Sequence, residues 1–86
     1  MNKLEKELKA LANKRRLSIV KYLEEKGEAN VTEVARQIQL SFKSTSRHLA
    51  ILRAVQVIER DQKGKEVYYR LEVPKSVIVR TILDLI

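Results

Sequence analysis

The sequence has no cysteine and no tryptophan, and only one histidine, one proline and two glycines among its 86 residues. Without cysteine the chain can form neither a disulfide nor a thiolate metal site, and one histidine by itself cannot supply a multidentate site. No Gly-rich phosphate loop is present, and the adjacent carboxylates Glu24 and Glu25 do not share a helix face. These absences argue against an enzyme, a metal effector and a cofactor.

A long hydrophobic run is also missing. The first ten residues, MNKLEKELKA, carry five charged side chains, which is unlike a signal peptide or a transmembrane helix. The lack of cysteine fits a reducing compartment. We therefore expect a cytoplasmic protein with no membrane partner.

Positive charge is the most prominent feature that is present. Eighteen Lys and Arg against eleven Asp and Glu give a net charge of +7. Residues 41–70 form the most basic part, with seven basic and three acidic side chains. Such a charge is typical of a nucleic-acid-binding protein. A single domain over residues 1–86 has only a thin core, so we expect a second copy to add stability.

Apolar spacing predicts two helices at the start of the chain. Leu4, Leu8 and Leu11 recur at i, i+4 and i+7, as in an amphipathic helix. Asn13 can cap a second helix, for which Gly27 supplies a permissive end. The basic run 14–16 then lies in the first turn of this helix, where the helix dipole disfavours it. We expect a phosphate or a carboxylate to compensate it.

Two more helices are predicted before residue 55. The third is expected to begin with Thr32 as its cap and to end near Leu40. The fourth is expected to follow Ser41, again as a cap, and to reach about Ala54. The connection between them is only a few residues long, which is typical of a helix-turn-helix.

After residue 54 the apolar period changes from 3.6 to 2. Residues 57–61 and 66–71 read as two strands, joined by a turn over 62–65 that contains Gly64. Pro74 is expected to begin a last, strongly apolar helix. The predicted fold is mainly α with a small β-hairpin, a winged helix-turn-helix with five helices and a two-stranded wing.

The apolar surface of the last helix is wide, and a terminal helix with such a surface needs a partner, which a second copy of the chain would supply. The interface residues expected are Leu4, Leu8, Leu11, Val79, Ile82, Leu83 and Ile86.

The helix of residues 41–54 is the predicted recognition helix, because the second helix of such a motif enters the major groove. The wing, about 57–71, is expected on the DNA backbone or in the minor groove. Phe42 is left open between packing on the preceding helix and touching a thymine methyl. His48 is expected to make either a structural hydrogen bond or a phosphate contact. The predicted DNA-binding residues are Ser41, Lys43, Ser44, Thr45, Arg47, His48, Arg60, Lys63, Lys65 and Arg70.

Three stretches resemble the ArsR family of winged-helix repressors. They are residues 11–19, the "SRHL" element of residues 46–49 with its surroundings from 40 to 53, and the "VYYRL" element of residues 67–71. The resemblance spans nearly the whole chain. It implies a winged fold, a dimer formed by the first and last helices, residues 1–12 and 75–86, and operator binding that represses transcription.

The sequence departs from this family at two places. Where metal-sensing members carry a Cys-x-Cys, this chain has residues 30–33, Asn-Val-Thr-Glu, so metal sensing is not carried over. Gln56 stands where the family commonly has glycine, and a left-handed backbone there disfavours Gln. The sequence therefore does not fix the residue at which the wing begins.

The sequence thus predicts a homodimeric, sequence-specific regulator of transcription that binds double-stranded DNA. The alternative is a winged-helix protein-interaction module without a specific DNA target, favoured by the apolar last helix. Structured RNA is a third possible partner. Operator, effector, and repression versus activation are not encoded in any visible motif.

Overall fold

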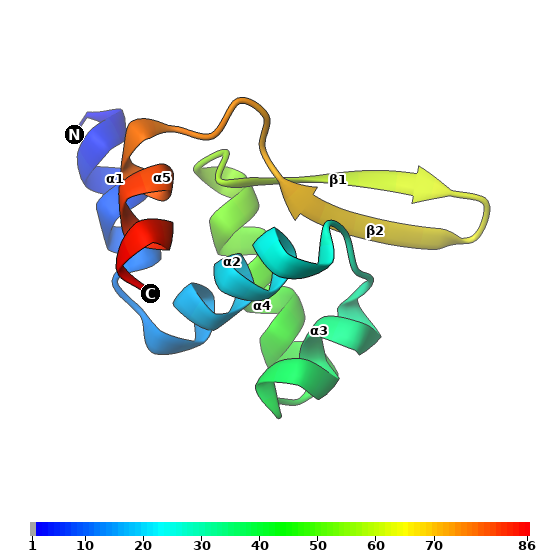
Figure 1. The fold of residues 1–86 in the computed structure, drawn as a ribbon. Helices are drawn as coiled ribbons and strands as arrows, with labels where there is room; N and C mark the ends of the chain where they lie inside the picture. The colour runs from blue at the N-terminus through cyan, green and yellow to red at the C-terminus, as the bar shows by residue number, and fades with distance from the viewer. Residues whose placement is uncertain (1) are drawn as a thin grey trace.

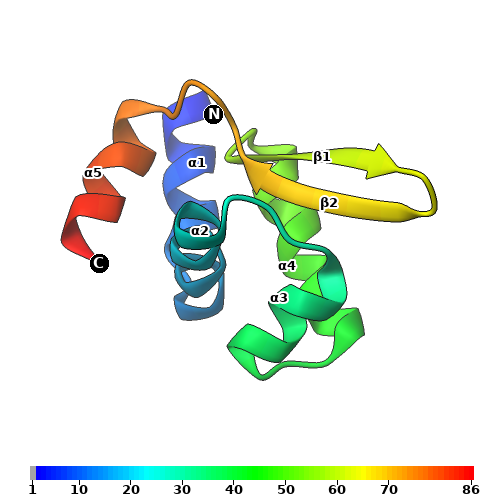
Figure 2. The same ribbon diagram turned by 45° about the vertical axis from the view of Figure 1, so that its right-hand side comes forward.

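A computed structural model describes residues 2–86, and its elements follow the predicted order. In Figures 1 and 2 the hairpin projects from one end of the molecule, and the first and last helices lie at the other end. The winged helix-turn-helix with five helices and a two-stranded wing is confirmed. The elements are α1 (Lys3–Leu11), α2 (Lys14–Lys26), α3 (Val31–Ile38), α4 (Phe42–Ala54), β1 (Ile58–Lys63), β2 (Glu66–Leu71) and α5 (Val77–Leu85).

The caps of α2 and α4 are those that the sequence predicts. The Asn13 side chain accepts hydrogen bonds from the N–H groups of Arg15 and Arg16, at 2.9 and 3.1 Å. The Ser41 hydroxyl accepts one from the N–H of Ser44 at 3.1 Å. Each bond satisfies a donor that has no partner inside its helix, so these side chains fix where the two helices begin.

The predicted start of α3 is wrong, because Asn30 and not Thr32 is its cap. The Asn30 side chain accepts a hydrogen bond from the N–H of Glu33 at 2.9 Å, and the Glu33 carboxylate accepts one from the N–H of Asn30 at 2.9 Å. This capping box satisfies two end groups at once, which a threonine two residues later does not.

The predicted start of α5 is also wrong. Pro74 lies in the connection before the helix, after a cis peptide bond, and Ser76 caps α5 instead. The Ser76 hydroxyl accepts a hydrogen bond from the N–H of Val79 at 3.1 Å and donates one to the Glu7 carboxylate at 2.5 Å. One side chain therefore both begins α5 and joins it to α1.

Both helices of the helix-turn-helix end in the same kind of left-handed turn. Gln39 after α3 has φ 56° and Gln56 after α4 has φ 62°. In each turn the next residue, Leu40 or Val57, donates its N–H to a carbonyl five residues back, at 3.1 and 3.0 Å. This arrangement is typical of a Schellman motif. The wing thus starts as it would with glycine at position 56, although Gln is strained there.

The hairpin pairs Ile58 with Leu71 and Arg60 with Tyr69 across its strands, and β1 runs two residues further than predicted. Its turn is therefore only Gly64 and the following residue. Gly64 has φ 64°, and positive φ at the first turn residue alone is typical of a type II′ turn. Ile58, Leu71 and Tyr69 are buried, so the base of the wing belongs to the core.

The core corrects part of the predicted dimer interface. Leu11 and Val79 are each 2% exposed and lie inside this chain's own core, so they are not available to a second copy. Ile82 and Leu83 are partly buried against the same core. The core residues are Leu11, Ile19, Val20, Leu23, Ala29, Val34, Ile38, Leu49, Leu52, Val57, Ile58, Tyr69, Leu71 and Val79.

Thr45 is the one polar side chain of α4 that is completely buried, and within residues 2–86 its hydroxyl has no hydrogen-bond partner. A buried hydroxyl without a partner destabilises the folded state. We expect Thr45→Val, which keeps the branched shape, to stabilise the protein by about 1 kcal/mol. Thermal unfolding should show this as a rise in Tm of roughly 5 °C.

Thr81→Val in α5 is the matched control. The Thr81 hydroxyl is exposed and already donates to the carbonyl of Val77 at 2.8 Å. Its loss should leave Tm unchanged or slightly lower. An equal rise in both variants would mean that valine itself, and not the buried hydroxyl, is responsible.

Candidate nucleic-acid interface

The exposed side of α4 carries two of the basic residues predicted to bind DNA. Lys43 and Arg47 lie one turn apart and are exposed, and Ala50 continues the same exposed side. Within residues 2–86 neither basic side chain makes an ion pair. Ser44, half-buried, borders them. Two cations and a hydroxyl therefore face outward from the N-terminal half of the recognition helix.

Two other residues predicted to contact DNA, Ser41 and Thr45, have structural roles instead. The Ser41 hydroxyl is engaged as the α4 cap. Thr45 is 0% exposed and cannot present its side chain to a ligand without a rearrangement of the core. We therefore leave Thr45 out of the interface.

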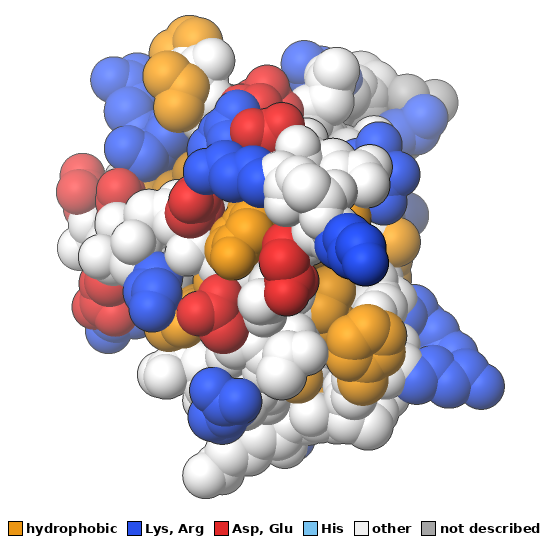
Figure 3. Space-filling view, turned by 90° about the vertical axis from the view of Figure 1, so that its right-hand side faces the viewer, with side chains coloured by type: hydrophobic (Ala, Val, Ile, Leu, Met, Phe, Trp, Pro, Cys, Tyr) orange, Lys and Arg blue, Asp and Glu red, His pale blue; other side chains and the backbone are white. Residues whose placement is uncertain are grey.

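Two basic residues of the wing are held by carboxylates. Lys63 lies 2.8 Å from the Glu28 carboxylate, and Arg70 lies 3.2 Å from Glu59 and 3.5 Å from Asp61. Figure 3 looks onto the wing end of the molecule and shows acidic and basic side chains mixed over this face. In the free protein Lys63 and Arg70 are thus each paired with a carboxylate on the surface.

Arg60 and Lys65 are the wing cations that carry no carboxylate partner within residues 2–86. Both are exposed, and neither makes an ion pair within the described part of the chain. The strand register places Arg60 opposite Tyr69, on the side of the hairpin that faces α3 and α4. Lys65 lies in the turn at the tip. These two residues frame the wing side of the interface.

A hollow lies between the wing and the helix-turn-helix, and two residues of α4 that line it, Phe42 and Ser46, are not among the predicted DNA-binding residues. Phe42 is 61% exposed at its rim, and Ser46, one turn further along α4, also lines it. Their i, i+4 spacing was the available signal that they share a side. The remaining lining residues are Asn30, Val31, Thr32, Arg60, Glu66, Val67 and Tyr69.

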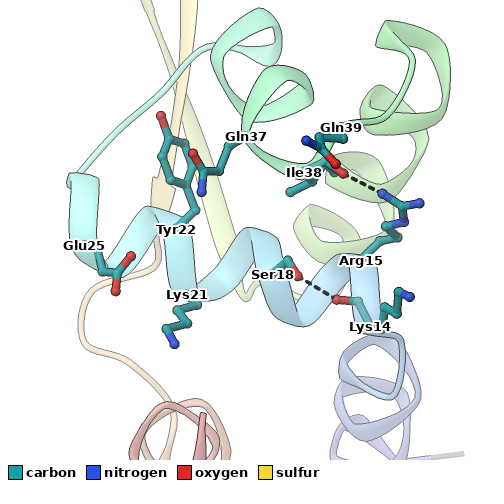
Figure 4. Close-up of a pocket in the computed structure, with 9 residues that line it drawn as sticks. All are labelled: Lys14, Arg15, Ser18, Lys21, Tyr22, Glu25, Gln37, Ile38 and Gln39. Carbon is teal, nitrogen blue, oxygen red and sulfur yellow. Dashed lines mark hydrogen bonds between the residues drawn. The ribbon is translucent and has the colours of Figure 1, made fainter.

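The basic run at the start of α2 has a different partner from the one predicted. Arg15 donates from Nη1 to the carbonyl of Ile38, the last residue of α3, as the close-up in Figure 4 shows. Arg16 donates from Nε to the carbonyl of Ala10 near the end of α1. For Arg15 and Arg16 the negative C-terminal ends of two helices, where cations are favourable, take the place of the predicted phosphate or carboxylate.

His48 makes the structural hydrogen bond that the sequence left as one option. Arg16 Nη1 donates to His48 Nδ1 at 3.1 Å, which leaves the ring proton on Nε2. Burial lowers the pKa of His48 below its ordinary value, and the positive charges of Arg16, Arg15 and Arg47 lower it further. His48 is therefore a neutral acceptor that ties α4 to α2.

Within residues 2–86 no three His, Cys, Asp or Glu side chains are grouped so that they could hold a metal ion. Over the same residues, no helix has the length and apolar character needed to cross a membrane.

Known proteins with similar sequences are regulators of transcription. The chain matches the family model described as HVO_A0114 over residues 11–79. It is 35% identical to the transcriptional repressor PagR of Bacillus anthracis over 68 residues, 79% of this chain and 68% of PagR. It is 34% identical to the transcriptional activator HlyU of Vibrio cholerae over 79 residues, 92% of this chain and 69% of HlyU. It spans only 56% of ArsR1, an arsenic resistance regulator of Pseudomonas putida.

Solved structures agree with these relatives. The structure of PagR superimposes with a TM-score of 0.82 at 31% identity, covering 96% of this chain and 91% of PagR. The homodimeric winged helix-turn-helix DNA-binding domain of Mb0332 from Mycobacterium bovis superimposes with a TM-score of 0.80 at 29% identity, covering 96% of this chain and 73% of that one. The fold, the order of elements and the relatives together show that this chain belongs to the ArsR family of winged helix-turn-helix, DNA-binding transcription regulators.

Proposed function

We propose that this protein binds a specific double-stranded DNA sequence as a homodimer, with α4 in the major groove and the wing on the backbone or in the minor groove. The observation that carries this proposal is the outward-facing pair Lys43 and Arg47 on α4, exposed and without an ion-pair partner in residues 2–86. Lys and Arg at this place can reach phosphates or pair with guanine O6 and N7.

Of the four wing cations predicted from the sequence to contact DNA, we propose that only two do so directly. Arg60 and Lys65 are the proposed backbone contacts, since they are exposed and free of ion pairs within residues 2–86. Lys63 and Arg70 would first have to leave their carboxylates, so we propose that they position the wing. His48 is proposed to orient α4 through Arg16, with Nε2–H as its remaining donor.

Exposed apolar side chains on α1 and α5 support the homodimer. The two helices lie at the end of the molecule opposite the wing tip (Figure 1), and a Mycobacterium bovis relative of the same fold is homodimeric. A two-fold dimer would present its two α4 helices to half-sites about 34–36 Å apart. The exposed apolar residues are Leu4 50%, Leu8 44%, Val77 65%, Leu85 79% and Ile86 41%.

Repression is the proposed outcome of binding. PagR is a repressor, while HlyU is an activator, so the family fold serves both. A compact dimer bound at a promoter blocks polymerase without further contacts, whereas activation needs an additional surface for a partner. We therefore propose a repressor, with no catalytic activity of its own.

The deciding experiment is fluorescence anisotropy with duplex DNA, duplex RNA and the promoter fragment of its own gene, across a salt series. Arg60 and Lys65, the proposed backbone contacts, give four phosphate contacts per dimer. The logarithm of affinity should then fall against the logarithm of salt with a slope of roughly −4, and of roughly −7 if Lys43 and Arg47 also lie on phosphates. Absence of duplex DNA binding at low salt would instead favour the protein-interaction module.

A further inference from the structure

Phe42 has no role yet in the proposed interface, because the sequence left it open between packing on the preceding helix and touching a thymine methyl. We propose that Phe42 is a specificity-determining residue that contacts the 5-methyl group of a thymine in the major groove. This inference rests on the proposed function, because it needs α4 to lie in that groove.

The first observation is exposure. Phe42 is the first residue of α4, and its side chain is 61% exposed, so packing on the preceding helix does not account for it. It is the only phenylalanine in the chain. Lys43 follows it directly and Arg47 lies just over one turn away, both exposed. Because successive helical residues are about 100° apart, Phe42 lies with Ser46 on the side of α4 that turns toward the wing, next to the side that carries Lys43 and Arg47. A large apolar ring therefore borders the basic surface proposed to meet DNA.

The second observation is the hollow beside the ring. Phe42 and Ser46 form its α4 wall, while Arg60 and Val67 belong to its wing wall. Arg60 is exposed and within residues 2–86 makes no ion pair, so it can hold a phosphate that enters between wing and helix. Figure 3 shows hydrophobic side chains open to solvent among charged ones on this end of the molecule. A DNA strand docked there brings its base edges to Phe42.

The chemistry of the ring selects the base. A phenyl ring has no hydrogen-bond donor or acceptor and cannot pair with the polar edges of guanine, cytosine or adenine. Thymine alone among the four bases presents a methyl group in the major groove. The N-terminal residues of a recognition helix reach base edges, which is where Phe42 stands. Covering both apolar groups removes them from water together.

The test removes that methyl group and nothing else. Binding sites are first selected from a random duplex pool with the wild-type protein, and each thymine of the selected site is then replaced singly by deoxyuridine. We expect one position in each half-site where the replacement weakens binding about fourfold, the effect of one buried methyl group. Replacing both symmetric positions should weaken binding about 16-fold.

Phe42→Ala should bind the thymine and deoxyuridine sites equally well. Since the ring is exposed, this variant should melt at the wild-type temperature. Lys43→Ala is the matched control on the neighbouring residue. It should weaken binding to both sites and keep the ratio between them.

Three results would overturn the inference. Wild-type protein could bind duplex DNA but respond to no thymine replacement, or Phe42→Ala could keep the full ratio; in both cases the proposed function stands and the role of Phe42 does not. If no duplex binds, the proposed function fails as well, and the exposed ring is better explained by a protein partner.

Discussion

Replacing both Lys43 and Arg47 by alanine is expected to weaken binding to the selected duplex at least 100-fold. The two side chains are exposed, and a dimer loses four contacts when both are removed. A bidentate contact from Arg to guanine contributes about 1–3 kcal/mol, and each lost phosphate contact also flattens the salt dependence. Titration of labelled duplex at two salt concentrations measures both effects.

Two further variants separate charge from recognition. Arg47→Lys keeps the charge but loses the planar pair of donors, so it should bind random DNA normally and lose preference for the selected site. Lys9→Ala removes one charge from an exposed position on α1 that helical spacing places away from Leu4 and Leu8. It should bind as the wild type does. Equal losses in Lys9→Ala and the α4 variants would mean that only net charge matters.

Leu8→Glu is expected to convert the protein to monomers and to weaken binding to the two-half-site duplex at least 100-fold. Leu8 is 44% exposed, so the substitution should not disturb the fold of one chain. In the proposed dimer it would place two carboxylates inside an apolar interface, and desolvating a charge costs several kcal/mol. Mass measured by light scattering, together with binding to one and two half-sites, tests this.

Leu8→Met is the control for this variant. It keeps an apolar side chain of similar volume and should remain dimeric. If Leu8→Glu stays a dimer at micromolar concentration, the interface lies elsewhere than on the exposed side of α1. Monomers that still bind the full site with wild-type affinity would show that DNA binding does not depend on dimerisation.

Local sequence rules failed where two good candidates stood close together. Thr32 is a suitable cap, but Asn30 can form a capping box with Glu33, and the box satisfies two end groups instead of one. Pro74 is a suitable first residue, but Ser76 both caps α5 and bonds Glu7, which is 69 residues away in the chain. Single-residue preferences are small, so a contact from another element decides between neighbours.

The basic residues show a different failure. Sequence counts each Lys and Arg as available for DNA, yet Lys63 is paired with Glu28, 35 residues away, and Arg70 with Glu59 across the hairpin. Arg16 looked misplaced at a helix start, yet it reaches His48 on another helix. Which cations remain free depends on where acidic side chains and carbonyls come together in space.

The sequence by itself determined the order and type of the elements, the helix-turn-helix, the wing, the caps at Asn13 and Ser41 and the family. These features depend on apolar period and on contacts within about four residues, which a linear pattern contains. The tertiary structure alone decided that Thr45 is buried, that Phe42 is exposed, and that Leu11 belongs to the core of one chain. Burial and ion pairing are set by segments that meet only after folding, so no local pattern specifies them.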